Sequence, residues 1–218
     1  ATTLNGAKSV LPFEMRPVDI IRYIDDNNCL DVRNLSADLV ERDLSKHVEK
    51  QLVTSLADLP RLRHFYGRTT ELDNMVNLLE ARATTLLVPG IAGIGKTTVA
   101  SKLIERFMHQ RNLLYHRCQD WEGSRSFFES VADWLSSMGN ADFSTYLAAT
   151  PVPQPADAAR ILVEALEGTP SLLVIDDFHK VSDMVLHQTF QAMSLALLGS
   201  EEKIGLVIFS RSFKPVVP

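Results

Sequence analysis

Gly90-Ile91-Ala92-Gly93-Ile94-Gly95-Lys96-Thr97-Thr98 lies between an apolar run at residues 84–89 and a helix-like run at residues 99–104. The stretch fits the pattern G-x-x-x-x-G-K-[ST], which requires a buried strand before it and a helix after it. The glycines let the backbone turn so tightly that successive N–H groups can point at phosphate oxygens, and the N-terminus of the helix adds a positive potential. The stretch therefore predicts a strand, a phosphate-binding loop and a helix.

Two side chains of this loop have expected roles of their own. Lys96 can reach the β- and γ-phosphates of a nucleoside triphosphate, and the hydroxyl of Thr97 can bind Mg²⁺. A glycine turn followed by an incidental lysine is the alternative interpretation, and the strand and helix on either side argue against it. The residues expected to contact the nucleotide are Gly90, Gly93, Ile94, Gly95, Lys96, Thr97 and Thr98.

A second stretch, Ser171-Leu172-Leu173-Val174-Ile175-Asp176-Asp177, is apolar until its last two residues. Such a run is typical of a central parallel strand that is covered on both faces. Ligands of open α/β sheets bind at the carboxyl ends of the strands, where these two carboxylates lie. We expect Asp176 to contact Mg²⁺, directly or through water, and to lie close to the hydroxyl of Thr97. We expect Asp177 to orient and polarise the water molecule that attacks the γ-phosphate.

A third apolar strand is expected at residues 203–210, and Arg211 follows it directly. Parallel strands bring their carboxyl ends to one edge of the sheet, so Arg211 is well placed to sense or stabilise the γ-phosphate. An arginine after a strand is otherwise an ordinary surface residue. His179 lies close to the acid pair in sequence, and we interpret it, like the other histidines, as structural or on the surface.

The remaining segments of this region alternate between helix and strand patterns. A helix is expected around residues 72–79, a strand at 113–118, and further helices at 95–110, 156–167 and 183–198. Alternation of this kind is typical of an α/β fold with a parallel sheet flanked by helices.

The composition of the chain excludes several classes of protein. A net charge of −5 over 218 residues provides no general attraction to nucleic acid or to an anionic membrane. No apolar run approaches the roughly 20 residues of a membrane span, and the first ten residues lack the pattern of a secretory signal. Cys29 and Cys118 lie far apart in the sequence and do not have the spacing of metal ligands. We expect them to be free thiols in a reducing compartment, and the alternative is a single disulfide between them. We therefore expect a cytoplasmic location.

The sequence predicts two domains, a mainly helical segment at residues 1–62 and a nucleotide-binding domain at 63–218. One helix is expected to begin at Pro17 and to end near residue 26. Apolar residues recur at helical spacing from Leu39 to Leu56, either in one long helix or in two short ones that would form a helix-turn-helix. Acidic and basic residues nearly balance in this segment, which favours a structural role over DNA contact.

These motifs together resemble those of STAND ATPases, the signal-transduction relatives of AAA+ proteins. Phe65-Tyr66-Gly67-Arg68-Thr69-Thr70-Glu71-Leu72 is similar to the hhGRxxE motif that precedes their nucleotide domain. Residues 90–98 resemble their Walker A motif, and residues 172–177 resemble their Walker B strand. Ile208-Phe209-Ser210-Arg211 resembles the sensor-1 strand of the NB-ARC branch. The resemblance covers residues 64–212 and is closest to prokaryotic members, archaeal ones included.

The resemblance implies a P-loop NTPase fold that binds ATP or ADP with Mg²⁺ and hydrolyses ATP slowly. It implies a molecular switch whose energy is used for self-assembly or for contact with a protein partner. Lys96, Asp177 and Arg211 would act in catalysis, and Phe65, Tyr66, Gly67 and Arg68 would lie beside the adenine and ribose. Family members continue into a helical lid and a winged helix, so we expect the chain to be part of a longer protein.

Two alternatives to the switch stay open. The first is a DNA-associated AAA+ ATPase similar to origin-initiator proteins, which share a Gly-Arg segment before the core. The second is a binding module that uses the nucleotide only to stabilise its fold.

Overall fold

The computed structural model describes residues 23–25, 28–30, 52–56, 59–60, 67–198, 200 and 202–211. The chain divides into two units, residues 1–51 and residues 52–218.

The first unit contains an antiparallel pair of short strands. Strands β1 (Tyr23–Asp25) and β2 (Asn28–Leu30) pair with Ile24 opposite Cys29. The helix expected from Pro17 is therefore wrong at residues 23–25, where an aromatic and a β-branched residue favour a strand. The other helical predictions for the first unit lie outside the described residues.

The second unit is built on a five-stranded parallel sheet with the strand order β3-β5-β6-β7-β4. All residues of β6 and β7 are buried, as expected of central strands that are covered on both faces, whereas β4 forms an edge and is partly exposed. The prediction of an α/β fold with a parallel sheet is confirmed. The strands are β3 (Thr54–Ser55), β4 (Thr84–Pro89), β5 (Asn112–Arg117), β6 (Ser171–Asp176) and β7 (Ile204–Ser210).

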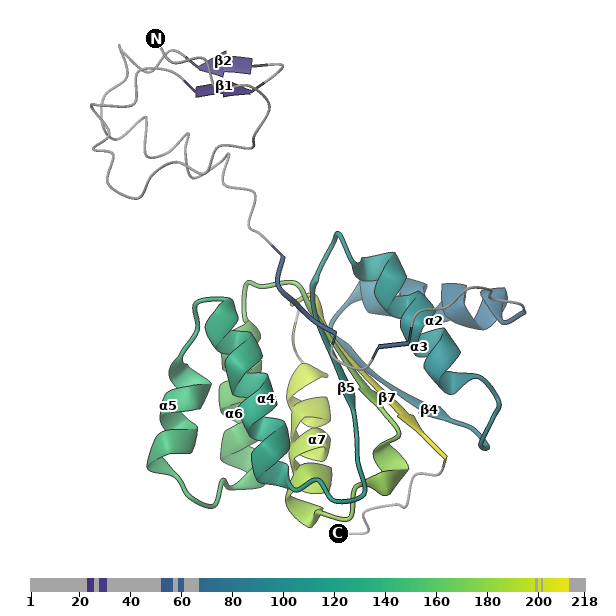
Figure 1. Cartoon of the computed structure of the whole chain (residues 1–218), viewed down its shortest axis with the longest axis vertical. Helices are drawn as coiled ribbons and strands as arrows, with labels where there is room; N and C mark the ends of the chain where they lie inside the picture. Colours follow the sequence, from purple (N-terminus) through teal and green to yellow (C-terminus); the bar gives the residue numbers. More distant parts are fainter. Residues whose placement is uncertain are drawn as a thin grey trace. The chain divides into compact units, whose positions relative to one another are not determined.

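Helices cover both faces of this sheet (Figure 1). Helices α2 (Thr69–Ala81) and α3 (Lys96–Phe107) lie on one face. The other face carries α4 (Ser124–Ser137), α6 (Pro155–Leu166) and α7 (Met184–Leu197), and α5 (Asp142–Ala149) packs against α4 and α6. A short 3₁₀ helix, η3 (Phe178–Lys180), follows β6. The crossovers from β4 to β5, from β5 to β6 and from β6 to β7 each contain at least one α-helix, as parallel pairing demands.

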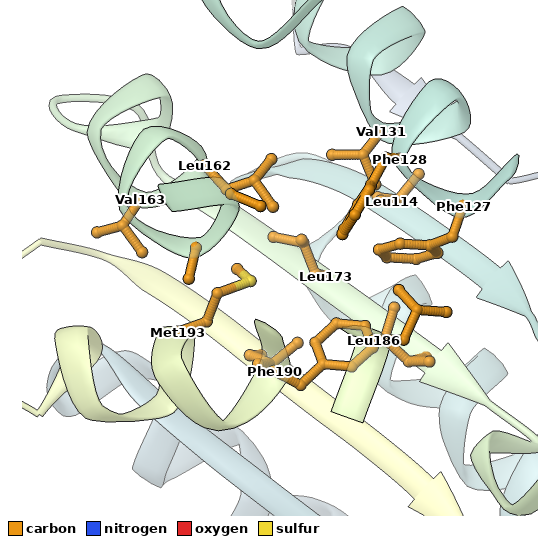
Figure 2. Close-up of a cluster of buried hydrophobic side chains, with 14 of the residues drawn as sticks. Leu114, Phe127, Phe128, Val131, Leu162, Val163, Leu173, Leu186, Phe190 and Met193 are labelled. Atoms are coloured by element: carbon orange, nitrogen blue, oxygen red, sulfur yellow. The ribbon is translucent and has the colours of Figure 1, made fainter. Parts of the chain in front are cut away.

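Two hydrophobic clusters hold these layers together, one on each face of the sheet. Figure 2 shows the cluster under α4, α6 and α7, in which the ring of Phe190 lies 5.3 Å from that of Phe127. Leu173 of β6 belongs to this cluster, whereas its neighbours Leu172 and Val174 belong to the cluster under α2 and α3. Side chains that alternate between the two faces therefore make β6 the centre of both cores.

Strand β3 corrects the sequence-based boundary between the domains. Helical spacing predicted that residues 52–56 continue a helix, but Thr54 and Ser55 pair in parallel with β5. The N–H of Val53 donates to Oδ1 of Asn112 at 2.8 Å, and the N–H of Leu113 donates to the carbonyl of Val53 at 2.9 Å. Pairing with the open edge of β5 therefore overrides the local helical pattern, and the second unit begins before residue 63.

The composition led us to expect free cysteines and no membrane-spanning segment. Cys118 is a free, buried thiol. None of the helices in the described residues combines the length and the apolar character needed to cross a bilayer.

Candidate functional site

The loop between β4 and α3 has the backbone geometry that its glycines predict. Gly93 (φ 76°) and Gly95 (φ 92°) adopt the left-handed conformation, which residues with a Cβ rarely reach. At Gly90, an added Cβ would lie 3.0 Å from Cγ2 of Ile94 and 3.5 Å from Cδ of Lys96. Two glycines thus suit the left-handed turn, and the third leaves room for the side chain of Ile94, because the distance to Lys96 is an ordinary contact.

The curled loop surrounds the ammonium group of Lys96. Nζ of Lys96 donates to the carbonyls of Gly90 at 2.7 Å and Ile91 at 3.0 Å, and the residue is only 8% exposed. Lys96 also opens α3, whose first turn contains no acidic residue. The first N–H groups of a helix have no partner within the helix, so this end combines free donors, a helix dipole and a cation. The arrangement suits a phosphate group.

Asp176 lies at the carboxyl end of β6 and is completely buried. Its Oδ2 accepts hydrogen bonds from Oγ1 of Thr97 at 2.6 Å and from the hydroxyl of Tyr115 at 3.1 Å. Its Oδ1 accepts from the N–H of Asp177 at 2.8 Å. The structure thus brings Thr97 and Asp176 together across 79 positions of sequence, even though β7 separates β4 from β6 in the sheet.

A hydroxyl and a carboxylate are oxygen ligands of the kind that Mg²⁺ prefers. Within the described ranges, His, Cys, Asp and Glu side chains form no cluster of three or more that could hold a metal ion by itself. This donor set fits Mg²⁺, which commonly takes one or two protein ligands and completes its shell with water and substrate phosphates.

Tyr115, in the middle of β5, is a member of the site that sequence reasoning missed. The residue is 2% exposed, and burial followed by the negative charge of Asp176 raises the pKa of its hydroxyl above the ordinary value. The phenol therefore stays protonated and acts as the donor to Asp176. A tyrosine on the strand beside the acid-bearing strand was the available signal, but the pairing of β5 with β6 was needed to interpret it.

Asp177 is held by two cations on the same oxygen. Oδ2 of Asp177 lies 3.1 Å from Nε of Arg117, at the end of β5, and 3.3 Å from Nζ of Lys180, in η3. Burial acts to raise the pKa of Asp177, but the hydrogen bonds and charges of the two cations outweigh it and leave the pKa below its usual value. Asp177 is thus an ionised carboxylate, and its backbone adopts a left-handed φ of 54°, which is rare outside glycine. Sequence reasoning identified neither cation.

Arg211 and His179 lie at the same edge of the sheet. The N–H of Gly90 donates to the carbonyl of Ser210 at 3.0 Å, which places the residue before Arg211 at the start of the loop. Burial, followed by the positive charge of Arg211, lowers the pKa of His179, so its imidazole is neutral at pH 7. Nδ1 of His179 is buried and has no hydrogen-bond partner within the part of the chain that the structure describes. His179 therefore belongs to the charged surroundings of the site.

The segment expected to contact the base is described only in part, because Phe65 and Tyr66 lie outside the described residues. Gly67 (φ 71°) and Arg68 (φ 57°) both adopt the left-handed conformation just before α2. The carbonyl of Arg68 accepts from the N–H of Leu72 at 3.0 Å, which begins the helix. A left-handed arginine is unusual, and such backbone conformations cluster at functional sites.

The sequence of this chain was compared with curated proteins and with models of protein families. A search of curated proteins finds no match to the chain. The family model described as AAA ATPase domain matches residues 64–203, a span that contains the loop, α3, β5 and the two acids but not β3. This match covers more than half of the chain, and the parallel sheet with its glycine loop has the architecture that such a domain requires. The chain therefore belongs to the AAA ATPase domain family.

Proposed function

We propose that this protein binds ATP together with Mg²⁺, hydrolyses it slowly and works as a molecular switch of the STAND type. One observation carries the proposal, which is the 2.6 Å contact between Oγ1 of Thr97 and Oδ2 of Asp176 beside the glycine loop. This contact joins a hydroxyl at the start of α3 to a buried carboxylate at the end of β6, at the edge of the sheet where ligands of open α/β sheets bind.

Thr97 and Asp176 would hold the metal ion, and the loop would hold the phosphates. When bound, Mg²⁺ neutralises the charge on the β- and γ-phosphate oxygens. An ammonium group has three hydrogen-bond donors, and the described contacts of Lys96 use two of them on Gly90 and Ile91. The third donor of Lys96 would reach a phosphate oxygen, while the loop carbonyls keep the ammonium in place.

Asp177 and Arg211 would act on the γ-phosphate. Arg117 and Lys180 both contact Oδ2 of Asp177. Oδ1 is therefore the oxygen that would accept a hydrogen bond from the water that attacks the γ-phosphate. A carboxylate held by two cations is a weak base, which is consistent with slow turnover. Arg211 follows β7 directly and would stabilise the charge that develops on the γ-phosphate.

The wider roles in this proposal come from the resemblance to STAND proteins. Residues 65–68 would lie beside the adenine and ribose. Residues 1–51 would form a separate domain, because β3 already belongs to the sheet of the second unit. Exchange of ATP for ADP would alter contacts with a protein partner or with other copies of the chain.

The first experiment measures binding and turnover in the same variants. We expect Lys96→Ala to abolish ATP binding in isothermal titration calorimetry, because it removes the cation that the loop encloses. We expect Asp177→Asn to bind ATP as the wild type does and to lose phosphate release. Lys102→Ala is the matched control, because Lys102 lies on the same helix but pairs with Glu105. Equal ATP affinity in the wild type and in Lys96→Ala would refute the proposed site.

The ion pairs of Asp177 favour a second candidate function, which is a module that binds ATP without turning it over. A carboxylate engaged by Arg117 and Lys180 is less able to polarise water. Thermal unfolding with ATP and with ADP, measured beside a phosphate-release assay, separates the two functions. Stabilisation by ATP together with no phosphate release would favour the binding module.

A further inference from the structure

We propose that Tyr115 is a positioning residue of the magnesium site, because its hydroxyl holds the carboxylate of Asp176 in the orientation that aligns Thr97 for the metal. The inference rests on the function proposed above. It assigns a role to a residue of β5, a strand that contains none of the ligands expected from the sequence.

Three donors surround the carboxylate of Asp176. Both oxygens of this buried carboxylate are engaged, Oδ1 by the N–H of Asp177 and Oδ2 by Thr97 and Tyr115. The N–H of Asp177 belongs to the next residue and fixes only one oxygen. The hydroxyl of Tyr115 comes from the neighbouring strand and fixes the other, so the carboxylate cannot rotate without breaking a hydrogen bond to a charged acceptor.

The hydroxyl of Thr97 is oriented by its hydrogen bond to Asp176. A threonine hydroxyl has one hydrogen and two lone pairs. When its hydrogen points to Oδ2 of Asp176, as the 2.6 Å contact indicates, the lone pairs are left for a metal ion. Tyr115 does not touch the metal in this arrangement. It acts through Asp176, because an acceptor that is held still keeps the hydrogen of Thr97 in one place.

Tyr115 is itself held in place by close packing. The ring lies in the cluster under α2 and α3, among side chains that include Val99 and Leu103 of α3. The residue is 2% exposed, and close packing leaves its two side-chain torsions little freedom. A donor fixed in this way can orient a ligand, whereas a mobile surface donor could not.

The competing explanation is that Asp176 merely satisfies a buried tyrosine hydroxyl, as buried polar groups generally require. That explanation predicts a change in stability and no change in metal affinity. Positioning predicts weaker metal binding whatever happens to stability. Metal affinity therefore separates the two.

The test compares Tyr115→Phe with Tyr146→Phe. Both variants lose one hydroxyl group and keep the ring. Tyr146 lies on α5, and its hydroxyl accepts from the N–H of Gln154 at 3.1 Å, away from the acid pair. The probe is Mn²⁺ in place of Mg²⁺, and its binding to the full chain with ADP is followed by the loss of the free-ion electron paramagnetic resonance signal. Fluorescent ADP in EDTA reports binding of the nucleotide without metal.

We expect Tyr115→Phe to weaken Mn²⁺ binding roughly tenfold, the usual loss when a group that orients a ligand is removed. We expect the same variant to bind ADP in EDTA as the wild type does, and Tyr146→Phe to match the wild type in both assays. All titrations are made well below the lowest thermal midpoint of the three proteins, so that a loss of stability does not imitate a loss of affinity.

Two adverse results have different meanings. If the wild type binds ADP and Mn²⁺, and Tyr115→Phe binds Mn²⁺ equally tightly, the positioning role is overturned and the proposed function stands. If the wild type binds ADP neither in EDTA nor with Mn²⁺, the proposed function itself fails, and the role of Tyr115 fails with it.

Discussion

At the scale of single residues, strand β5 is notable for its contacts with both acids. Tyr115 donates to Asp176, and Arg117 pairs with Asp177. Residues two apart on a strand point to the same face, whereas consecutive residues of a strand point to opposite faces. Asp177 lies just past the end of β6 and has a left-handed φ of 54°, so it does not follow that alternation. The pairing register, which places Arg117 opposite Asp176, brings both contacts to the carboxyl end of β6.

Substitution of Arg117 tests the electrostatics of Asp177. Burial raises the pKa of this carboxyl, and hydrogen bonds from Arg117 and Lys180 bring it below its usual value. Arg117→Ala removes one cation and leaves the carboxyl partly buried, so the pKa of Asp177 rises. The measurement is the pH titration of the Asp177 carboxyl carbon by nuclear magnetic resonance, and the midpoint is expected at higher pH in the variant.

The matched control for this titration is Arg160→Ala, which breaks an exposed pair with Glu164 on α6. It should leave the titration of Asp177 unchanged. A midpoint that does not move in Arg117→Ala would show that Arg117 does not stabilise the charge of Asp177.

At the scale of elements, β7 packs unusually closely against its surroundings at Gly205. A Cβ at this position would lie 2.6 Å from Cδ2 of Leu79 on α2 and 2.8 Å from Cδ1 of Leu172 on β6. Both leucines are fully buried, so neither methyl group can move into solvent. The absence of a side chain at Gly205 thus allows α2 to approach the sheet.

We expect Gly205→Ala to lower the free energy of unfolding by about 1–3 kcal/mol, the usual effect of adding a methyl group to a packed core. Urea unfolding followed by circular dichroism measures the change. Gly123→Ala is the control, because a Cβ there would lie 3.7 Å from Oδ2 of Asp183, an ordinary contact. Equal stability of the two variants would contradict the close packing inferred at Gly205.

Strand β3 shows where reading elements from sequence fails. Its two residues are flanked by leucines at helical spacing, and nothing in so short a segment distinguishes a helix from a strand. The decisive factor is the unpaired edge of β5, more than 50 residues later, which supplies partners for the backbone of Val53. Local periodicity carries no information about such a distant edge.

At the scale of the whole molecule, nucleotide binding should couple to the stability of the second unit. The proposed ligand contacts residues from the β4–α3 loop, α3 and the end of β6, so it would bind the folded sheet and not the unfolded chain. At a concentration one hundred times its dissociation constant, such a ligand stabilises the folded state by about 2.7 kcal/mol.

We therefore expect ADP with Mg²⁺ to raise the thermal midpoint of the wild type and to leave that of Lys96→Ala unchanged, as measured by scanning calorimetry. Lys102→Ala serves again as the control and should respond like the wild type. An equal shift in Lys96→Ala would indicate that the nucleotide binds elsewhere.

The sequence by itself predicted strands β4 to β7, helices α2, α3, α6 and α7, the glycine loop and the strand that ends in two acids, but it did not predict α5. These features depend on short patterns of apolar residues, glycines and charges, which act locally along the chain. Only the tertiary structure decided that β3 extends the sheet, that β7 separates β4 from β6, and that Tyr115, Arg117 and Lys180 hold the two acids. The physical reason is that strand pairing and side-chain contacts join residues far apart in the chain, and their free energy depends on packing that no local pattern encodes.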